Sequence, residues 1–385
     1  MRGSFQFMKS VNKKAVLNEI RLNGPISRAN IAKETGLTPP TVTNIVKELI
    51  EEAFVKESHL GESSGGRKPT LLQLNEEGYY VIGVDAGSNT IEAAVCNLYG
   101  HTLLRFENEI PKAIDREKFL NIMKQTIKKL LEDETVQSNK IIGIGVAMHG
   151  VMNIEEGVSY YSSNSGLENV PVKYELEKEF GYEVLLENNS RALALGEFWF
   201  GGFKHVDCFC GINVGRGVGS GLVVNGKLFH GPQYVAGEIG HTVISVNGRQ
   251  CKCGNKGCLE TFVSSESIVK RAKKQISQAP ENLTAEDVYH YAVEGNKEYI
   301  HVLEETGYYL SIGLLNLINT INPDTIVLGG GVMKSAEFLM PIIMDNVRTK
   351  ALTSKVRNEV NIFVGKLDDD ATLLGAAALV FNEYF

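Results

Sequence analysis

Apolar residues recur at helical spacing in three segments near the start of the chain, and turn residues separate these segments. The spacing predicts a helix over 9–23, which Gly24 and Pro25 end because neither residue continues a helix well. Ser27 can cap a helix with its side chain, so a short second helix is expected over 28–35. The inward side chains of this second helix would be Ala29, Ile31 and Ala32.

A third helix is predicted after a sharp turn at Gly36. Thr38 can cap this helix, and Pro39 suits its first position, where a missing backbone N–H breaks no hydrogen bond. The helix would bury the apolar side chains of Val42, Ile45, Val46, Leu49 and Ile50. Small polar side chains and one cation would face outward near its start, namely Thr41, Thr43, Asn44 and Lys47. A short helix, a turn and a capped helix form the helix-turn-helix order.

Two segments with strand character follow, over 54–58 and 70–74, and a polar, glycine-rich run separates them. Arg67 and Lys68 come directly after two glycines of this run, so both cations would lie on an easily bent backbone. A pair of strands with a basic tip makes the helix-turn-helix a winged one.

A winged helix-turn-helix can bind double-stranded DNA with its third helix in the major groove. Hydroxyl and amide groups can bond base edges there, and cations can contact phosphates or enter the minor groove. The alternative is a small three-helix bundle that packs on the rest of the chain or on another protein. We predict DNA binding because the cap, the turn, the polar outer face and the basic wing agree. The contact residues would be Thr38, Thr41, Thr43, Asn44, Lys47, Arg67 and Lys68.

After residue 78 the pattern changes to apolar strands that alternate with amphipathic helices. The clearest helix covers 119–132, and strands are expected at 81–84, 92–97, 141–147, 184–187, 210–214 and 325–328. This alternation predicts an α/β body in two lobes. We expect a winged helix-turn-helix head at 1–75, a first lobe at 79–190 together with 371–385, and a second lobe at 191–370.

The composition is that of a folded globular protein, because 43% of the 385 residues are hydrophobic and 22% are charged. The net charge is −7, but residues 1–75 hold eleven Lys and Arg against seven Asp and Glu, a net +4. The remaining residues therefore carry −11. A basic head on an acidic body suggests an anionic partner for the head alone.

Neither a membrane-spanning apolar stretch nor a secretory leader is found in the sequence, so a cytoplasmic protein without a membrane partner is expected. Residues 1–4 look like an expression-vector leader, and Met8 can be the natural start. Residues 1–7 are therefore given no role in the fold.

Three glycine-rich turns follow predicted strands of the body. In a nucleotide-dependent phosphotransferase such turns let the backbone approach phosphates, and an aspartate can hold magnesium through water. The third turn also suits close contact with a flat ligand such as adenine. The alternative is that each glycine cluster is only a turn. A remnant of a nucleotide site would involve Asp85, Gly87, Gly215, Gly217, Gly329 and Gly330.

One histidine and three cysteines lie close together in the second half of the chain. An imidazole and three thiols can close a tetrahedral zinc site that leaves no position for a catalytic water, so the zinc would be structural. The alternative is a reduced cysteine cluster without metal. Cys208 and Cys210 share one face of a strand, where buried packing is expected. The zinc ligands would be His241, Cys251, Cys253 and Cys258.

The segment from Gly237 to Glu260 resembles a signature of the ROK family of repressors, open reading frames and kinases. It reads Gly-Glu-Ile-Gly-His, followed by Cys-x-Cys-Gly-x-x-Gly-Cys-x-Glu, and the resemblance extends over nearly the whole chain from Lys9. The resemblance implies an actin-like, ribonuclease-H-like two-lobed fold of the sugar kinase type, a structural zinc, a sugar cleft between the lobes and a homodimer or homotetramer. A winged head before such a body is similar to the repressor branch, which includes the xylose-operon repressors, because the kinase members lack it.

The resemblance also implies sugar-binding positions. The family's Glu-Asn-Asp motif matches Glu187-Asn188-Asn189, and His241 would use one ring nitrogen for zinc and the other for the sugar. Carboxylates and amides suit a ligand with many hydroxyl groups. The alternative is that these groups only cap loops. The expected sugar-binding residues are Asn188, Asn189, Glu238, His241 and Glu260.

Three departures from the kinase pattern argue against catalysis, and no catalytic residue is expected. Asn189 stands where the kinases have their general base, and loss of such a base lowers the rate by about 10²–10⁴-fold. The first phosphate turn reads Asp85-Ala86-Gly87-Ser88-Asn89 in place of Asp-x-Gly-Gly-Thr. In the second turn Arg216 replaces a small hydroxyl residue, although its charge could also attract a phosphate.

The sequence thus predicts a sugar-responsive repressor of carbohydrate-utilisation genes that binds operator DNA. The enzymatic alternative is an ATP-dependent kinase of a hexose that carries a regulatory DNA-binding head. A third alternative is a response to a sugar-transport protein that docks on the acidic body, in place of a response to free sugar.

Overall fold

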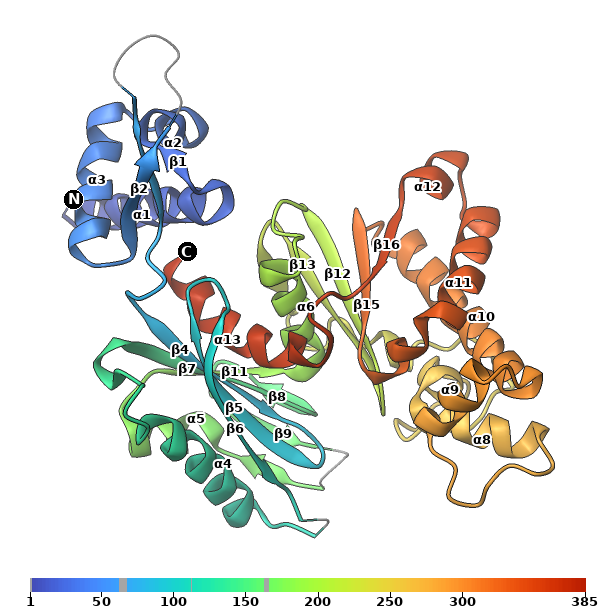
Figure 1. Ribbon diagram of the computed structural model, residues 1–385. Helices are drawn as coiled ribbons and strands as arrows, with labels where there is room; N and C mark the ends of the chain where they lie inside the picture. Colours follow the sequence, from blue (N-terminus) through green and yellow to red (C-terminus); the bar gives the residue numbers. More distant parts are fainter. Residues whose placement is uncertain (1, 62–67, 112, 163–165) are drawn as a thin grey trace. The chain divides into compact units, whose positions relative to one another are not determined.

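The computed structural model describes residues 2–61, 68–111, 113–162 and 166–385 (Figure 1). They form two units: the first consists of Met1–Met148, Ile154–Glu187 and Ala376–Phe385, and the second of His149–Asn153 and Asn188–Gly375. The first unit includes the predicted head, so the division into a head and two lobes stays a prediction. Among the described residues, no helix is both long enough and apolar enough to cross a membrane.

The head has three helices and a three-stranded antiparallel sheet, as expected for a winged helix-turn-helix. The helices are α1 (Arg2–Asn23), α2 (Arg28–Thr35) and α3 (Pro39–Glu51). The sheet order is β1-β3-β2, with β1 (Ile26–Ser27), β3 (Thr70–Leu74) and β2 (Val55–Leu60). Because α1 begins at Arg2, residues 2–7, which were given no role in the fold, extend this helix.

Local signals in the sequence set the ends of α2 and α3. The Ser27 hydroxyl accepts the N–H of Asn30 at 3.2 Å and so caps α2, and Gly36 ends this helix with a φ of 69°. Thr38 lies at the cap position of α3, but its hydroxyl is bonded to the Thr41 hydroxyl at 2.8 Å and makes no cap bond to the backbone. The cap position was therefore predicted correctly, while the cap hydrogen bond was not.

The core of the head combines apolar side chains from all three helices and from β3, including Val16, Ile20, Ile31, Val42, Val46 and Leu72. Two residues that we expected to be buried are not. Ala29 is exposed because it lies two positions, or about 200° of helical turn, from the buried Ile31. Ile50 is half-buried because it lies about 100° from the buried Leu49, at the edge of the inward face.

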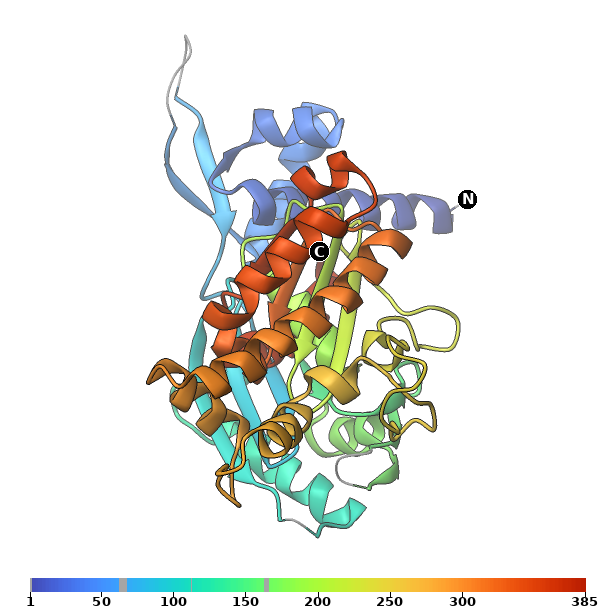
Figure 2. The same ribbon diagram turned by 90° about the vertical axis from the view of Figure 1, so that its right-hand side faces the viewer.

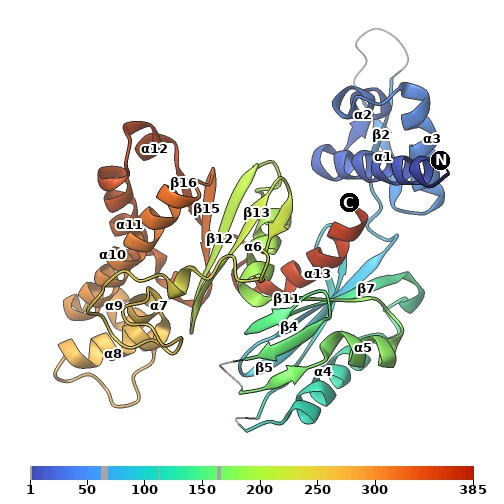
Figure 3. The ribbon, with the colours of Figure 1, turned by 180° about the vertical axis from the view of Figure 1, so that it is seen from behind.

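The rest of the first unit is built on a five-stranded mixed sheet of order β11-β7-β4-β5-β6. Its strands are β4 (Tyr80–Ala86), β5 (Thr90–Asn97), β6 (Thr102–Glu109), β7 (Ile141–Met148) and β11 (Val184–Asn188). α4 (Arg116–Leu131) and α5 (Val172–Phe180) cover one face, and the last turns of α13 (Ala371–Tyr384) cover the other (Figure 3). Two short strands, β9 (Val158–Tyr161) and β10 (Glu168–Val170), pair antiparallel.

The second unit has another five-stranded mixed sheet, of order β14-β13-β12-β15-β16. Its strands are β12 (Cys208–Val214), β13 (Val218–Val224), β14 (Lys227–Phe229), β15 (Thr325–Gly329) and β16 (Asn361–Val364). α6 (Asn189–Phe200) packs on one face against β12 and β13. The other face is covered by α8 (Ser265–Gln275), α9 (Ala285–Val293), α10 (Lys297–Thr320) and α11 (Ala336–Lys350) (Figure 2). The shorter elements are β8 (Val151–Asn153), α7 (Glu260–Val263) and α12 (Ser354–Glu359).

Alternation along β12 shows how this sheet is filled on both faces. Cys210 and Ile212 belong to the core beneath the helical layer, whereas Gly211 points toward α6, where a Cβ would lie 2.6 Å from Ala194. Cys210 is buried, as expected for packing, while Cys208 at the start of the strand is only half-buried. Every strand predicted for the body is present, and each is longer than predicted.

Candidate functional site

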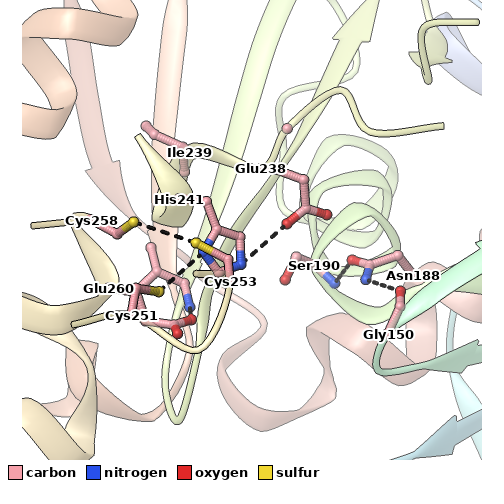
Figure 4. A network of polar contacts seen from close by, with 12 residues as sticks. Gly150, Asn188, Ser190, Glu238, Ile239, His241, Cys251, Cys253, Cys258 and Glu260 are labelled. Atoms are coloured by element: carbon pink, nitrogen blue, oxygen red, sulfur yellow. Dashed lines mark hydrogen bonds and ion pairs between the residues drawn. The ribbon is translucent and has the colours of Figure 1, made fainter. Parts of the chain in front are cut away.

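Four side chains meet in the second unit with the geometry of a metal centre (Figure 4). His241 ends a short 3-10 helix, and Cys251, Cys253 and Cys258 lie on the loop before α7. The ligand atoms of all four residues lie within 4.8 Å of one another. The sulfurs of Cys253 and Cys258 are 3.6 Å apart, and His241 Nδ1 lies 3.6 Å from Cys251 Sγ. A zinc tetrahedron with Zn–S bonds of about 2.3 Å has edges of about 3.8 Å, so this donor set fits zinc.

Backbone hydrogen bonds and two glycines with positive φ shape the cysteine loop. The N–H of Cys251 donates to the carbonyl of Asn255 at 2.8 Å, and Gly254 lies in this turn with a φ of 94°. Gly257 has a φ of 72° and passes so close to Ser245 that a Cβ would overlap the serine carbonyl. The two glycines are therefore required by the path of the loop that carries the cysteines.

The three thiols of the cluster differ in acidity. Burial raises the pKa of Cys258 to about 12 and also raises the pKa of Cys251. The pKa of the exposed Cys253 thiol is lowered to about 7, chiefly because its sulfur accepts a hydrogen bond from the backbone N–H of Asn255. Since metals bind the thiolate form, metal binding at this cluster would release protons from the two buried thiols.

Two acidic side chains expected to bind sugar lie next to the cluster. Glu238 Oε2 is 4.0 Å from His241 Nε2, so the imidazole faces the thiols with one nitrogen and a carboxylate with the other (Figure 4). The Glu238 side chain is 43% exposed, which leaves it accessible to a ligand. Glu260 begins α7 and accepts the N–H of Val218 at 3.1 Å. Glu260 therefore also supports the turn between β12 and β13.

Two asparagines, Asn188 and Asn189, lie at the start of α6. Asn188 caps the helix, because its Oδ1 accepts the N–H groups of Ser190 at 2.9 Å and Arg191 at 3.4 Å. Its Nδ2 donates to the carbonyl of Gly150 at 3.2 Å (Figure 4). Both polar atoms of Asn188 thus bond the backbone, and its contact with sugar hydroxyls stays a prediction. Asn189 lies in the first turn of α6 and is 7% exposed.

Arg191 supports this site and was not identified from the sequence. Its side chain is 2% exposed, and its guanidinium donates to the carbonyls of Tyr234 at 3.0 Å and Ala236 at 3.4 Å. These carbonyls belong to the loop that leads to Glu238, so Arg191 fixes that loop to α6. The available signal was an arginine in a largely apolar helix, since a buried charge must be satisfied by buried partners.

Asp85, at the end of β4, is the acidic group of the first glycine-rich turn. The pKa of Asp85 is raised to about 7, mainly because the carboxyl group is buried and to a smaller extent because the Glu92 carboxylate lies nearby. Asp85 and Gly87 belong to the first unit, while the glycines of the other two turns belong to the second. A carboxyl group that binds its proton near neutral pH makes stability depend on pH.

We expect Asp85→Asn to stabilise the protein by roughly 1–2 kcal/mol at pH 8 and to change little at pH 5. The folded-state pKa of about 7 lies above the ordinary value of 3.8, so the folded chain binds this proton more tightly than the unfolded chain. The wild type therefore loses stability as the pH rises from about 4 through 7, and an amide avoids this loss. Denaturant unfolding at both pH values, with the exposed Asp345→Asn as control, measures the difference. Equal effects of Asp85→Asn at the two pH values would contradict it.

The glycines of the second and third turns differ in how closely other atoms approach them, and Gly330 has the closest backbone neighbours. The N–H of Ser265 donates to the carbonyl of Gly215 at 2.9 Å, and a Cβ on Gly217 would lie 3.1 Å from Glu260 Oε2. Gly330 has a φ of 87° and borders a small hollow of about 50 Å³ at the ends of β15 and β16. Gly329, Glu197, Lys334 and Asp369 also line this hollow. These contacts are compatible with plain turns and with a nucleotide remnant.

The outer face of α3 presents most of the residues expected to contact DNA. Thr41 is half-buried, and the exposed residues are Thr38, Thr43, Asn44 and Lys47. The Lys47 ammonium lies 3.7 Å from Glu51, and an exposed pair of this kind contributes only about 0.3–0.5 kcal/mol, so a phosphate can replace the carboxylate. On the wing, Lys68 is exposed, whereas Arg67 lies outside the described residues.

Both the head and the body of the chain are similar to known proteins. A sequence model of the ROK family matches residues 81–383, and one of winged helix-turn-helix DNA-binding domains matches residues 10–56. The chain is 32% identical to a protein named xylose repressor from Caldicellulosiruptor bescii, over 99% of this chain and 98% of that protein.

Two solved structures share the fold to different extents. A ROK family transcriptional regulator, described as a homolog of the Escherichia coli Mlc protein, is similar over 98% of this chain and 97% of its own, with a TM-score of 0.85 and 29% identity. A ROK family glucokinase from Streptomyces griseus, in complex with glucose and AMPPNP, is similar over 79% of this chain and 99% of its own, with a TM-score of 0.70 and 25% identity.

Proposed function

Because the chain belongs to the ROK family, we propose that it is a sugar-responsive transcriptional repressor that binds operator DNA. The observation that carries the proposal is a single chain in which a winged helix-turn-helix with an exposed third helix, α3, precedes a ROK family body. The resemblance places Asn189 where the kinases have their base, which supports a role other than catalysis. The head would bind DNA and the body would bind the sugar. The genes under its control would serve carbohydrate use, as the names of similar repressors suggest.

The polar start of α3 would enter the major groove. An asparagine such as Asn44 can make two hydrogen bonds to an adenine, and Lys47 would contact a phosphate. Lys68 and Arg67 on the wing would add phosphate or minor-groove contacts. A homodimer or homotetramer would bring two heads to a two-fold symmetric operator.

We expect Asn44→Ala to weaken binding to the selected operator by about 5–100-fold, because a base contact is lost. Lys47→Ala should instead weaken binding to every duplex and lower the salt slope by about one, because one phosphate contact is lost. Fluorescence anisotropy at several salt concentrations, with a duplex selected from a randomised library, measures both effects. Lys274→Ala, an exposed cation of α8, serves as control. Wild-type affinity in both head variants would refute this DNA face.

We propose that the protein is cytoplasmic and that its His–Cys₃ cluster holds a structural zinc. His241, Cys251, Cys253 and Cys258 would be its four ligands, so no position is left for a reacting water. When bound, zinc supplies four strong bonds to a loop with few apolar side chains. The His241 ring would then be held with Nε2 toward Glu238 and the sugar.

The sugar would bind among Asn188, Asn189, Glu238, Glu260 and the outward edge of the His241 ring. Carboxylates and an amide can each bond neighbouring hydroxyls of a polyhydroxyl ligand. Bound sugar can change operator affinity only if it binds one arrangement of the heads more tightly than another, typically by about 1–3 kcal/mol. Arg191 would keep the loop of Glu238 fixed to α6 during that change.

The kinase alternative is favoured by the likeness to the Streptomyces griseus glucokinase and disfavoured by Asn189. We expect ATP-dependent turnover of glucose or xylose at about 10⁻²–10⁻⁴ of the rate expected with a general base, because an amide accepts no proton. A coupled ADP-release assay measures it, with Asn189→Asp as the comparison that returns a carboxylate. Turnover by the wild type at the rate of an ordinary sugar kinase would overturn the repressor proposal.

The docking alternative makes a different prediction for purified protein. A repressor that binds sugar directly releases or tightens its DNA on addition of sugar alone. If no sugar of a broad panel changes DNA binding by the purified protein, the signal is better explained by a sugar-transport protein that docks on the acidic body.

A further inference from the structure

α13 is buried along most of its length. Its residues from Ala371 to Ala378 are all buried, and Phe381 is fully buried. A helix that is apolar on all sides needs packing partners on all sides. The boundary between the two units falls within this helix, after Gly375, so each unit contributes one set of partners.

The start of α13 packs directly on α6, within the second unit. A Cβ on Gly375 would overlap the carbonyl of Ala192, and a Cβ on Gly196 would overlap the carbonyl of Ala371. No side chain can separate the two backbones at these points, so neither helix can shift there without the other. α6 is the helix whose first turn holds Asn189 and whose Arg191 anchors the loop of Glu238.

The end of α13 contacts the DNA-binding head through an aromatic group, within the first unit. Phe54 lies three residues beyond the end of α3, just before β2, and is 8% exposed. Its ring centroid lies 5.7 Å from that of Tyr384 and 4.4 Å from that of Tyr79. Rings at such separations interact favourably beyond the area that they bury.

A second contact joins the end of α13 to α1. The Arg21 guanidinium lies 6.0 Å from the centroid of the Phe385 ring, within the range of a cation–π interaction. Burial lowers the pKa of Arg21 to about 10, which agrees with a guanidinium that is largely removed from water. Lys14, also on α1, donates to the carbonyl of Glu383.

We propose that Tyr384 and Phe385 are positioning residues that couple the head to the sugar site through α13. A shift of α6 on sugar binding moves the start of α13, and a continuous helix transmits the shift to its last turn. The aromatic and cation–π contacts there then reorient α1 and α3. This inference rests on the proposed function, because it requires a head that binds DNA and a body that binds sugar.

The test compares the wild type with the double variant Tyr384→Ala, Phe385→Ala in the full chain. D-xylose and D-glucose are the probes, and thermal shift measures whether each binds. In the wild type, the effective sugar should change affinity for the selected duplex by about 5–150-fold. In the double variant we expect less than about a twofold change, with the sugar-induced thermal shift retained. A change as large as that of the wild type would overturn the proposal.

Conservative and distant variants separate coupling from a loss of folding. The single variant Tyr384→Phe keeps the aromatic ring and loses only the hydroxyl. We expect it to respond to sugar like the wild type, because the proposed contact is made by the ring. Tyr174→Ala removes an aromatic ring that is 62% exposed on α5 and should leave the response at the wild-type level. A loss of response in Tyr174→Ala equal to that of the double variant would also overturn the proposal.

Hydrogen exchange tests the contact without DNA or sugar. The N–H of Phe54 donates to Leu49 at 3.0 Å and that of Asn75 donates to Phe54 at 2.9 Å, so both report on the junction of head and body. We expect faster exchange of these two amides in the double variant than in Tyr174→Ala. Unchanged exchange would overturn the positioning role. A wild type that binds neither duplex nor sugar would instead refute the proposed function, while exchange would still decide whether the contact holds the head.

Discussion

Replacement of Cys258 by serine is expected to remove the metal from the protein and to destabilise the second unit by roughly 3–5 kcal/mol. Cys258 is buried, and its sulfur lies 3.6 Å from that of Cys253, so its loss opens the tetrahedron. The hydroxyl of serine is a poor substitute because it stays protonated near neutral pH. Structural zinc in small protein sites contributes about 10–16 kcal/mol of binding free energy, and binding is coupled to folding of the loop.

Elemental analysis of the purified protein measures this effect together with thermal unfolding. We expect about one zinc per wild-type chain and almost none in Cys258→Ser after dialysis against a weak chelator. Cys208→Ser is the matched control, because Cys208 is half-buried and lies outside the cluster. A wild type without stoichiometric metal, or a Cys258→Ser protein that keeps it, would show that the cluster is only a group of reduced thiols.

Glu238→Ala is expected to weaken sugar binding by roughly 10²-fold or more and so to abolish the response of the repressor. Each hydrogen bond between a carboxylate and a hydroxyl group contributes about 1.5–3 kcal/mol, and one carboxylate can bond two neighbouring hydroxyls. Glu238 is exposed enough to meet a ligand and lies 4.0 Å from the Nε2 of His241. Operator affinity without sugar should stay within about twofold, because surface substitutions away from an interface have small effects.

Sugar titrations by calorimetry, and anisotropy with the selected duplex, separate the two parts of this prediction. Glu281→Ala, an exposed carboxylate of the same unit, controls for a general change of charge. Metal content should stay at the wild-type level, which distinguishes loss of the sugar contact from loss of the zinc loop. A Glu238→Ala protein that responds to sugar like the wild type would remove Glu238 from the binding site.

The head could be predicted almost completely from the sequence because its signals are local. A cap at Ser27, a turn at Gly36 and a proline at the start of α3 each act within one helical turn. The errors at Ala29 and Ile50 arose where burial depends on the angle around the helix. That angle shifts by about 100° for each residue, so a small error in the assumed face exposes a side chain.

The metal cluster could be predicted because three of its four donors lie within eight positions of the chain. The expected sugar site rests on resemblance to a family and stays a prediction, since carboxylates and amides in loops have no spacing of their own. Asn188 also has a structural role that the motif did not indicate, because its Oδ1 caps α6 and its Nδ2 donates to the carbonyl of Gly150.

The sequence alone determined the order of the parts, the winged head, the members of the His–Cys₃ cluster and the amide at position 189, because each depends on residues that are near one another in the chain. The tertiary structure decided which side chains support them. Arg191 reaches carbonyls more than forty positions away, and the last turn of α13 meets α1 and Phe54 across most of the chain. Such contacts leave no local pattern, because they arise only when folding brings distant backbone and buried charge together.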